Sequence, residues 1–325
     1  MAHNIAENKR MFYTGEAPWH GLGKKLDNPA TSKEAIEAAG LDYLVELQPL
    51  KYEVPSCKTE PQIVPQYRAT VRKDNGAFLG MVSERYTIVQ NHDAFDFFDN
   101  VVGEKAAMYH TAGALGNGER MWILAKLPTS IMVFKDDVVD KYLLLTTSHD
   151  GKSPLMAYFT PVRVVCQNTL NASMTDAASG IAIRHVGDIS TKVQEAREVL
   201  GLSMKYFGEF EETAKAFCAK QMNSQRLSAY VNRVLDVEEA DLVDNKRAAN
   251  VKATILSLAE AGKGNGETGI RGTLWAAYNG VTEYADHHKE VNTEKDKTNR
   301  LKSVWFGTSA KLKNRAFAEA LKLVR

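Results

Sequence analysis

Four side chains that could do chemistry recur every four residues in the segment GTLWAAYNGVTEYADHH. If residues 273–288 form one helix, a continuous stripe contains Trp275, Asn279, Glu283 and His287. Glu283 and His287 have the types and spacing of metal ligands, but a usable site needs at least one more ligand. We interpret the stripe first as an exposed or interfacial face, and second as part of a metal-dependent hydrolase or nuclease.

The turn TSHDGKS (147–153) carries His149 and Asp150, and an enzyme of this kind would use one or the other together with Glu283 and His287. Asp-Gly is common in hairpin turns, so we favour a plain turn here. The glycine-rich segment AGKGNGETGIRG (261–272) lacks the G-x-x-x-x-G-K-[ST] order of a nucleotide P-loop. We therefore assign no catalytic residue, no metal and no cofactor.

Cys166 is a second candidate, as a nucleophile, in the segment TPVRVVCQNTLNASM (160–174). In a strand, alternation places Val164 and Cys166 on one face and Arg163 and Gln167 on the other. A thiol buried on an apolar face has a raised pKa and is a weak nucleophile. The pattern predicts that Cys166 is a core residue and that a ligand would contact the face of Arg163 and Gln167.

Basic residues interleaved with aromatic residues indicate single-strand binding, because cations neutralise phosphates and aromatic rings stack on bases. In YRATVRK (67–73), alternation predicts that Arg68 and Arg72 face solvent while Tyr67 and Val71 face the core. The C-terminal region adds lysines and arginines around Trp305, although solvated helix faces would give the same composition. The candidate nucleic-acid contacts are Arg68, Arg72, Lys73, Arg85, Tyr86, Arg163, Gln167, Lys263, Arg271, Lys302, Trp305 and Lys311.

Composition limits the class of protein. The 325 residues are 44% hydrophobic and 25% charged, as in an ordinary globular protein, and the net charge of +1 gives no global attraction to nucleic acid. The three cysteines are widely separated, which argues against a disulfide framework and a cysteine-rich zinc site. No segment has the roughly 18 consecutive apolar residues of a membrane span, and the first residues lack the apolar core of a secretion signal, so we expect a cytoplasmic protein.

The order of elements predicts an α+β fold. Thr31, followed by Glu34, marks the start of a short helix, and strands near 67–73, 77–82 and 86–89 precede a helix that begins near Asn91. An N-terminal antiparallel-sheet unit with β-β-β-α order is thus followed by a mostly helical C-terminal half, with domains at 1–186 and 187–325. The helices expected in the second domain are 225–237, 245–261, 273–288 and 308–324.

Several motifs identify a family resemblance. The chain resembles the phage and plasmid proteins grouped as domain of unknown function 932 in PWHGLG (18–23), YTIVQN (86–91), TAGALGNGERMWILAKLP (111–128), LLLTTSHDG (143–151), TPVRVVCQNTL (160–170) and GTLWAAYNGVTEYADH (272–287). The resemblance covers nearly the whole chain. It implies a protein of a mobile element in a bacterial host cell, with no established reaction attached.

The β-β-β-α order is also similar to that of the single-strand annealing proteins of phage recombination, which form rings or filaments on DNA. That resemblance implies a self-associating protein that binds single-stranded DNA in recombination, replication or repair. The alternatives are the metal-dependent hydrolase or nuclease and a host-interaction or counter-defence protein. We expect no membrane partner.

Overall fold

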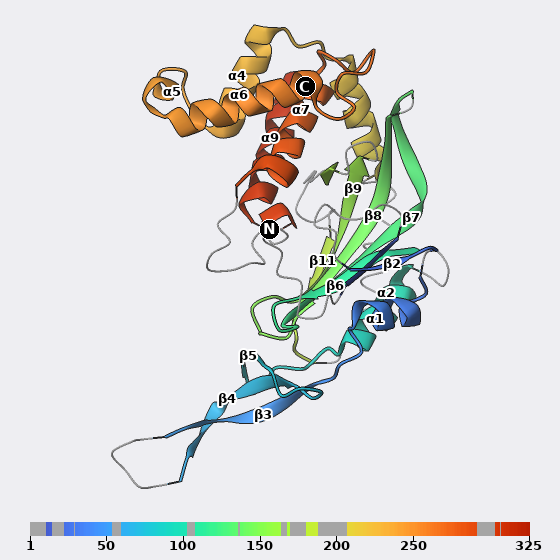
Figure 1. Cartoon of the computed structure of the whole chain (residues 1–325), viewed down its shortest axis with the longest axis vertical. Helices are drawn as coiled ribbons and strands as arrows, with labels where there is room; N and C mark the ends of the chain where they lie inside the picture. Colours follow the sequence, from blue (N-terminus) through green and yellow to red (C-terminus); the bar gives the residue numbers. More distant parts are fainter. Residues whose placement is uncertain are drawn as a thin grey trace.

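Two sheets and a helical half make up the chain (Figure 1). The computed structural model describes residues 11–14, 23–28, 30–53, 60–102, 108–135, 137–163, 168–169, 180–187, 207–290, 303–305 and 307–325. The predicted α+β class is confirmed, because strands dominate the first half and helices the second. The predicted core residue Cys166 and the candidate contacts Gln167 and Lys302 lie outside the described residues, as does the side chain of Arg163.

The larger sheet is built around a long hairpin. Its strands are β1 (Met11–Thr14), β2 (Lys24–Leu26), β6 (Met108–Leu115), β7 (Arg120–Phe134), β8 (Asp137–Ser148), β9 (Leu155–Arg163), β10 (Asn168–Thr169) and β11 (Gly180–Ile183). Their order is β10-β9-β8-β7-β6-β1-β2, with β11 also paired to β9. Every pair is antiparallel except β1 with β2.

The smaller sheet projects away from the larger one (Figure 1). It contains β3 (Val45–Tyr52), β4 (Gln62–Arg72) and β5 (Phe78–Ser83), and α2 (Asn91–Val102) follows. The predicted β-β-β-α order is therefore present. The expected strand at 86–89 is wrong, since residues 86–90 are not in a strand and β3 supplies the third one.

Helix α1 (Ser32–Ala39) begins as the sequence predicts. Thr31 accepts a hydrogen bond from the backbone N–H of Glu34, and the Glu34 carboxylate accepts one from the backbone N–H of Thr31. This reciprocal pair satisfies two N–H groups that a helix start leaves without partners. Gly40 ends the helix in the left-handed conformation, which glycine adopts without a steric penalty.

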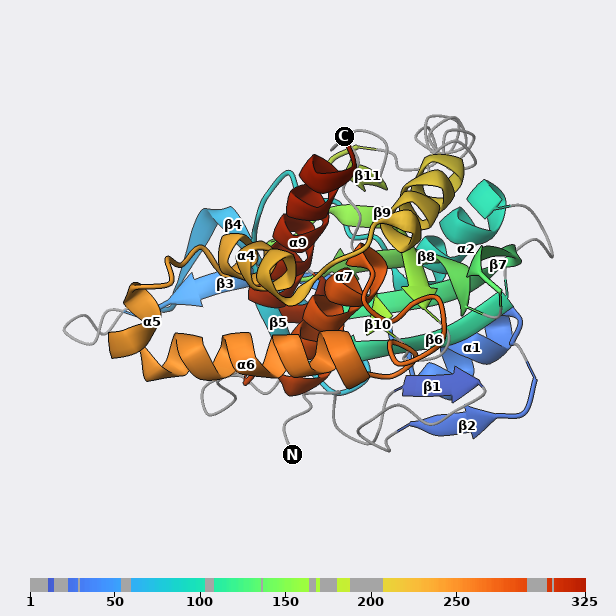
Figure 2. The same cartoon turned by 90° about the horizontal axis from the view of Figure 1, so that it is seen from above.

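The helical half lies over one end of the larger sheet (Figures 1 and 2). It contains a helix over 207–219, α4 (Ser224–Leu235), α5 (Asp241–Asp244), α6 (Lys246–Ala261), α7 (Leu274–Glu283), the π-helix η2 (Tyr284–His288) and α9 (Thr308–Val324). The expected helices near 225–237, 245–261, 273–288 and 308–324 are confirmed to within two residues at their ends. Among the helices of the described ranges, none is long and apolar enough to cross a membrane.

One hydrophobic cluster joins the larger sheet to the helical half. Phe159 of β9 packs edge to face on Phe207, with ring centroids 5.6 Å apart. Trp275 of α7 is fully buried, and its indole N–H donates to Asp137 of β8 at 2.7 Å. These contacts fix α7, and with it η2, relative to the larger sheet.

The face prediction for β4 is wrong. Thr70 and Arg72 are 0% and 2% exposed, whereas Tyr67 on the opposite face is 43% exposed. The hydroxyl of Thr70 donates to the backbone carbonyl of His149 at 2.7 Å, so the polar face of the smaller sheet packs against the β8–β9 turn. The two-residue repeat of side chains along a strand assigned each residue of β4 to the correct one of two faces. It could not show which of these faces is covered by the rest of the protein.

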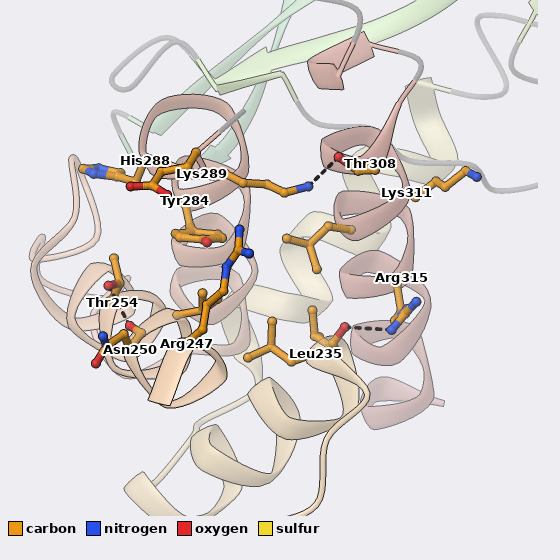
Figure 3. Close-up of a pocket in the computed structure, with 14 residues that line it drawn as sticks. Leu235, Arg247, Asn250, Thr254, Tyr284, His288, Lys289, Thr308, Lys311 and Arg315 are labelled. Carbon is orange, nitrogen blue, oxygen red and sulfur yellow. Dashed lines mark hydrogen bonds between the residues drawn. The ribbon is translucent and has the colours of Figure 1, made fainter. Parts of the chain in front are cut away.

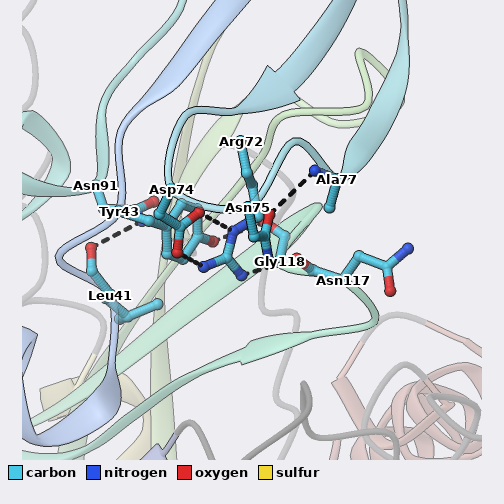
Figure 4. A network of polar contacts seen from close by, with 9 residues as sticks. All are labelled: Leu41, Tyr43, Arg72, Asp74, Asn75, Ala77, Asn91, Asn117 and Gly118. Atoms are coloured by element: carbon cyan, nitrogen blue, oxygen red, sulfur yellow. Dashed lines mark hydrogen bonds and ion pairs between the residues drawn. The ribbon is translucent and has the colours of Figure 1, made fainter.

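Arg72 anchors the smaller sheet to the larger one (Figure 4). Its guanidinium pairs with Asp74, donates to the carbonyl of Asn117 at 3.0 Å and stacks 3.8 Å from the centre of the Tyr43 ring. The hydroxyl of Tyr43 in turn donates to the carbonyl of Gly118 at 2.7 Å. Arg72 is therefore a structural residue, and its guanidinium is not exposed to contact a phosphate.

Candidate anion-binding pocket

A cavity of about 770 Å³ opens among four elements of the helical half. Figure 3 shows its walls, which are the end of α4, one face of α6, η2 with the residues just after it, and the first turns of α9. The volume lies within the range of about 300–1,000 Å³ that is usual for binding pockets of small molecules. The helical half therefore has a concave surface on which a ligand could be held.

In two of the walls, helical spacing places the lining residues on one face of the helix that carries them. Arg247, Val251 and Thr254 of α6 recur at three- and four-residue steps, so all three line the cavity. Lys311 and Arg315 of α9 are four residues apart and line the opposite wall. Each helix buries its remaining apolar face against the core and leaves these cations at the cavity.

The π-helix forms the third wall. It continues α7 directly, and the backbone N–H of Lys289 donates to the carbonyl of Tyr284 at 2.7 Å, which closes the wider turn. Tyr284, His288 and Lys289 all line the cavity. Short π-helical turns are frequent at functional sites, because the wider turn redirects side chains that an α-helix would place elsewhere.

The lining of the cavity is strongly cationic. Four of the residues that line it are Lys or Arg, namely Arg247, Lys289, Lys311 and Arg315, and Glu290 is the acidic residue among them. In the part of the chain that the structure describes, no hydrogen bond or ion pair involves the side chain of Arg247 or Lys311. The pocket therefore offers two cations that an anionic ligand can reach without breaking an internal contact.

The other two cations have partners within the chain. Lys289 donates to the hydroxyl of Thr308 at 2.7 Å, while Arg315 lies 3.6 Å from the carboxylate of Asp236 and 3.4 Å from the carbonyl of Val234. Partial burial, with a further contribution from the charge of Arg247, lowers the pKa of Lys289. Crowding of positive charge at this point favours the binding of an anion between the walls.

A buried ion pair lies behind the pocket and ties η2 to α9. The ammonium of Lys313 is 0% exposed and donates to the carboxylate of Asp286 at 2.7 Å. Burial lowers the pKa of Lys313, and the adjacent Asp286 carboxylate opposes that shift. The pair connects the two walls that carry Lys289 and Lys311. Lys313 is therefore a core residue.

The stripe of α7 is not an exposed face, and that prediction is wrong. Trp275 and Asn279 are 0% exposed and Glu283 is 6% exposed, while His287 alone among the four is exposed. The carboxylate of Glu283 accepts the backbone N–H of Lys263 at 3.1 Å, and the side-chain amide of Asn279 donates to the carbonyl of Trp275 at 2.9 Å. The helix is covered on nearly all sides, so its four-residue repeat serves packing and backbone hydrogen bonding.

A comparison with protein families finds a match over residues 78–305, to the family described as domain of unknown function (DUF932). The chain belongs to this family. The matched residues include α6 and η2, two walls of the pocket, and end before α9. Comparison with curated proteins and with solved structures found no match.

The remaining cations predicted in this DUF932 protein do not gather in one place. Lys73 and Arg85 are exposed near the smaller sheet, and Lys263 and Arg271 are exposed in the glycine-rich turn region. The guanidinium of Arg68 donates to the carbonyls of Pro65 and Tyr67, both at 2.9 Å, so its own strand occupies it. Of the predicted contacts, the pocket contains Lys311.

The two predicted aromatic contacts have structural partners. The hydroxyl of Tyr86 donates to the carbonyl of Ser148 at 2.9 Å, and its ring stacks on His185 with centroids 4.9 Å apart. Trp305 is half-buried and packs edge to face against Trp122 of β7 at 5.3 Å. Both rings therefore hold elements together, whatever further role they have.

The residues of the enzymatic alternative can be placed in the structure of this DUF932 protein. Over the ranges that the structure describes, no group of three or more His, Cys, Asp or Glu side chains could hold a metal ion. His149 is fully buried, and its Nε2 lies 2.9 Å from the amide oxygen of Asn91. Burial, with a smaller contribution from His185, lowers the pKa of His149 to about 4. The imidazole is therefore neutral near pH 7 and holds the turn against α2.

Sequence reasoning missed most of the pocket. Arg247, Tyr284, His288 and Lys289 come from two elements that lie about forty residues apart in the chain. A local signal exists within each element, since Tyr284 and His288 are four residues apart and Arg247 shares a helical face with Thr254. No local pattern shows that the two faces meet each other and α9.

Proposed function

We propose that this DUF932 protein binds single-stranded DNA, and that the pocket at η2 is a principal contact. The observation that carries the proposal is the lining of the cavity, to which four lysine and arginine residues contribute and one carboxylate residue, Glu290. Lysine and arginine side chains neutralise phosphates, and this interaction supplies most of the affinity of proteins that bind nucleic acid without sequence preference.

The ring of Tyr284 supports a single strand over a duplex. Figure 3 shows the guanidinium of Arg247 beside this ring, and both residues line the cavity. Tyr284 is half-buried, and this burial raises the pKa of its hydroxyl, so the ring is neutral near pH 7. A neutral aromatic face next to cations suits an unpaired base, whose stacking contributes about 1–3 kcal/mol.

The smaller sheet offers a second surface of similar chemistry. Tyr67 and Phe78 are 43% and 56% exposed, and the pairing of Phe78 with Val71 places both rings on the same face of the sheet. Lys73 and Arg85 are exposed nearby. Aromatic side chains on an open sheet face stack on bases in several classes of single-strand binding protein. This face would extend the contact without replacing the pocket.

We further propose that the protein belongs to a phage or plasmid, acts in recombination, replication or repair, and associates with further copies on DNA. Membership of the DUF932 family and the motifs that it shares with phage and plasmid proteins support the first part. The order β3, β4, β5, α2 supports the likeness to single-strand annealing proteins, and it does so at the level of fold alone.

Photocrosslinking tests where the strand binds. The wild-type protein is irradiated with an oligonucleotide that carries a photoactivatable base analogue, and mass spectrometry identifies the crosslinked peptides. We expect crosslinks at Tyr284, because the proposed stacking places a base on its ring, and their loss in Tyr284→Leu. Crosslinks confined to Tyr67 and Phe78, or to the larger sheet, would contradict the assignment of the pocket.

A further inference from the structure

Two buried histidines lie at the joint between the smaller and the larger sheet. His149, in the β8–β9 turn, and His185, just after β11, are 0% and 5% exposed. The backbone carbonyl of His149 accepts the hydroxyl of Thr70 on β4 at 2.7 Å. The backbone carbonyl of His185 accepts the N–H of Thr87 at 2.9 Å, in the segment that leads from β5 to α2. Both histidines are thus on the side of the larger sheet and hold residues of the smaller sheet or of its connection.

The imidazole of His149 has one nitrogen that is hydrogen-bonded and one that is not. Nε2 lies 2.9 Å from the amide oxygen of Asn91, whose amide nitrogen donates to the carbonyl of Leu41 at 2.9 Å. An amide oxygen can only accept, so Nε2 carries the proton and Nδ1 does not. Nδ1 is buried and has no hydrogen-bond partner within the described part of the chain. A proton added at Nδ1 would enter a buried place without an acceptor, which costs free energy.

The groups around His149 also oppose its protonation. The guanidinium of Arg72, itself 2% exposed, belongs to the smaller sheet, and the ring of Tyr43 packs edge to face on the imidazole with centroids 6.3 Å apart. Burial is the main cause that lowers the pKa of His149, and His185 and Arg72 lower it further, while Asp150 raises it. The resulting pKa is about 4, compared with about 6.5 for an exposed histidine.

The imidazole of His185 contacts both sides of the joint. Its Nδ1 lies 3.3 Å from the carbonyl of Thr87, and its Nε2 lies 3.0 Å from the hydroxyl of Thr147 on β8. Its ring stacks on Tyr86, with centroids 4.9 Å apart. Burial lowers the pKa of His185, and the contact with the carbonyl of Thr87 opposes that shift. His185 therefore also favours its neutral form while the two sheets are in contact.

We infer that this joint is an acid-sensitive latch, in which protonation of His149 and His185 releases the smaller sheet from the larger sheet while each sheet keeps its strand pairing. A charged His149 would repel the guanidinium of Arg72, which anchors the smaller sheet. In the described chain, β3, β4 and β5 pair with one another and not with the larger sheet, so release breaks no strand pairing. The inference goes beyond the proposed function and does not depend on it.

The direction of the pH effect follows from the pKa of His149 in the two arrangements. In the released arrangement the imidazole reaches water and its pKa returns toward 6.5, so the released protein binds more protons than the docked protein between about pH 6.5 and pH 4. Above this window both arrangements are neutral and docking keeps its full stability. Within it, each fall of one pH unit favours release about tenfold. His149 alone therefore favours release about thirtyfold more at pH 5 than at neutral pH.

Hydrogen–deuterium exchange followed by mass spectrometry tests the latch in the full chain. The amide of Thr87 reports on release, because its N–H donates across the joint to the carbonyl of His185. Exchange is measured at neutral pH and at pH 5, and each rate is corrected for the intrinsic effect of pH. We expect the protection of peptides that contain Thr87 to fall about thirtyfold or more at pH 5, while peptides of β7 and β8 keep their protection.

Three variants assign the pH effect to the two histidines. His149→Gln removes a site of protonation and keeps an N–H that can donate to Asn91, so we expect most of the thirtyfold effect to be lost. His185→Gln is the second test, and we expect a smaller part of the effect to be lost. His92→Gln is the matched control, because His92 lies on α2 with a side chain that is 53% exposed, and it should keep the full effect.

Each outcome decides for or against the latch. Unchanged protection of Thr87 at pH 5 would overturn it. An equal fall of protection in β7 and β8 would show that acid unfolds the whole chain, which would also overturn it. A full pH effect in both His149→Gln and His185→Gln would show that the release has another origin. None of these measurements uses DNA, so their result does not decide whether the protein binds a single strand.

Discussion

A chain with both Arg247→Glu and Lys311→Glu is expected to bind single-stranded DNA about a hundredfold more weakly than the wild type. A hydrogen bond to a charged group contributes about 1.5 kcal/mol or more, so the loss of two such contacts removes about 3 kcal/mol, or two factors of ten. The introduced carboxylates add repulsion of the phosphates. Neither cation has an internal partner among the described residues, so we expect the variant to fold normally.

The matched control changes the same amount of charge far from the pocket. Lys24→Glu with Lys25→Glu alters two exposed residues of β2, at the edge of the larger sheet. Fluorescence anisotropy with a labelled single strand measures both variants under one set of conditions. We expect the control to lose less than about threefold, which is the scale of a long-range effect at physiological ionic strength. Equal losses in the two variants would show that the net charge of the protein matters and the pocket does not.

Lys313→Met is expected to lower the free energy of unfolding by about 3–5 kcal/mol, because it removes the ammonium that pairs with the buried carboxylate of Asp286. That loss is a large part of the 5–15 kcal/mol that is typical of a folded protein. The double variant Asp286→Asn with Lys313→Met is expected to recover most of it, since neither charge then remains in the core. Urea denaturation monitored by circular dichroism measures the three proteins.

Lys322→Met is the control for this stability measurement. Lys322 lies on the same helix and pairs with Glu319 at 2.6 Å, but its side chain is 69% exposed. Exposed ion pairs contribute about 0–1 kcal/mol, so the substitution should cost less than about 1 kcal/mol. If Lys313→Met costs no more than Lys322→Met, the buried pair does not fix η2 against α9.

The helices of this chain are predictable because their signals are local. Thr31 with Glu34 forms the capping box that the sequence predicts, and the apolar spacing locates α4, α6 and α9 to within two residues. The turn at Asp150 and Gly151 is equally local. Such features depend on residues within one helical turn or one hairpin, so the sequence contains everything that determines them.

The orientation of faces and the pocket depend on distant contacts. Arg72 and Tyr67 alternate along β4 as expected, yet the polar face is covered because the His149 turn accepts a hydrogen bond from Thr70. Glu283 lies in a four-residue repeat that resembles a ligand-binding stripe, yet Lys263, from another segment, donates to its carboxylate. A sequence pattern gives the period of an element, whereas the partner that covers each face comes from the tertiary fold.

The salt dependence of single-strand binding by the wild-type protein tests the central claim most directly. Single-strand affinity varies with salt concentration with a slope of about −0.7 per phosphate contact on logarithmic axes, so four cations predict a slope of about −3. From 50 to 200 mM salt, the affinity for a labelled oligonucleotide should then fall about fiftyfold. An absence of binding at 50 mM salt, or an affinity that does not change with salt, would contradict the account.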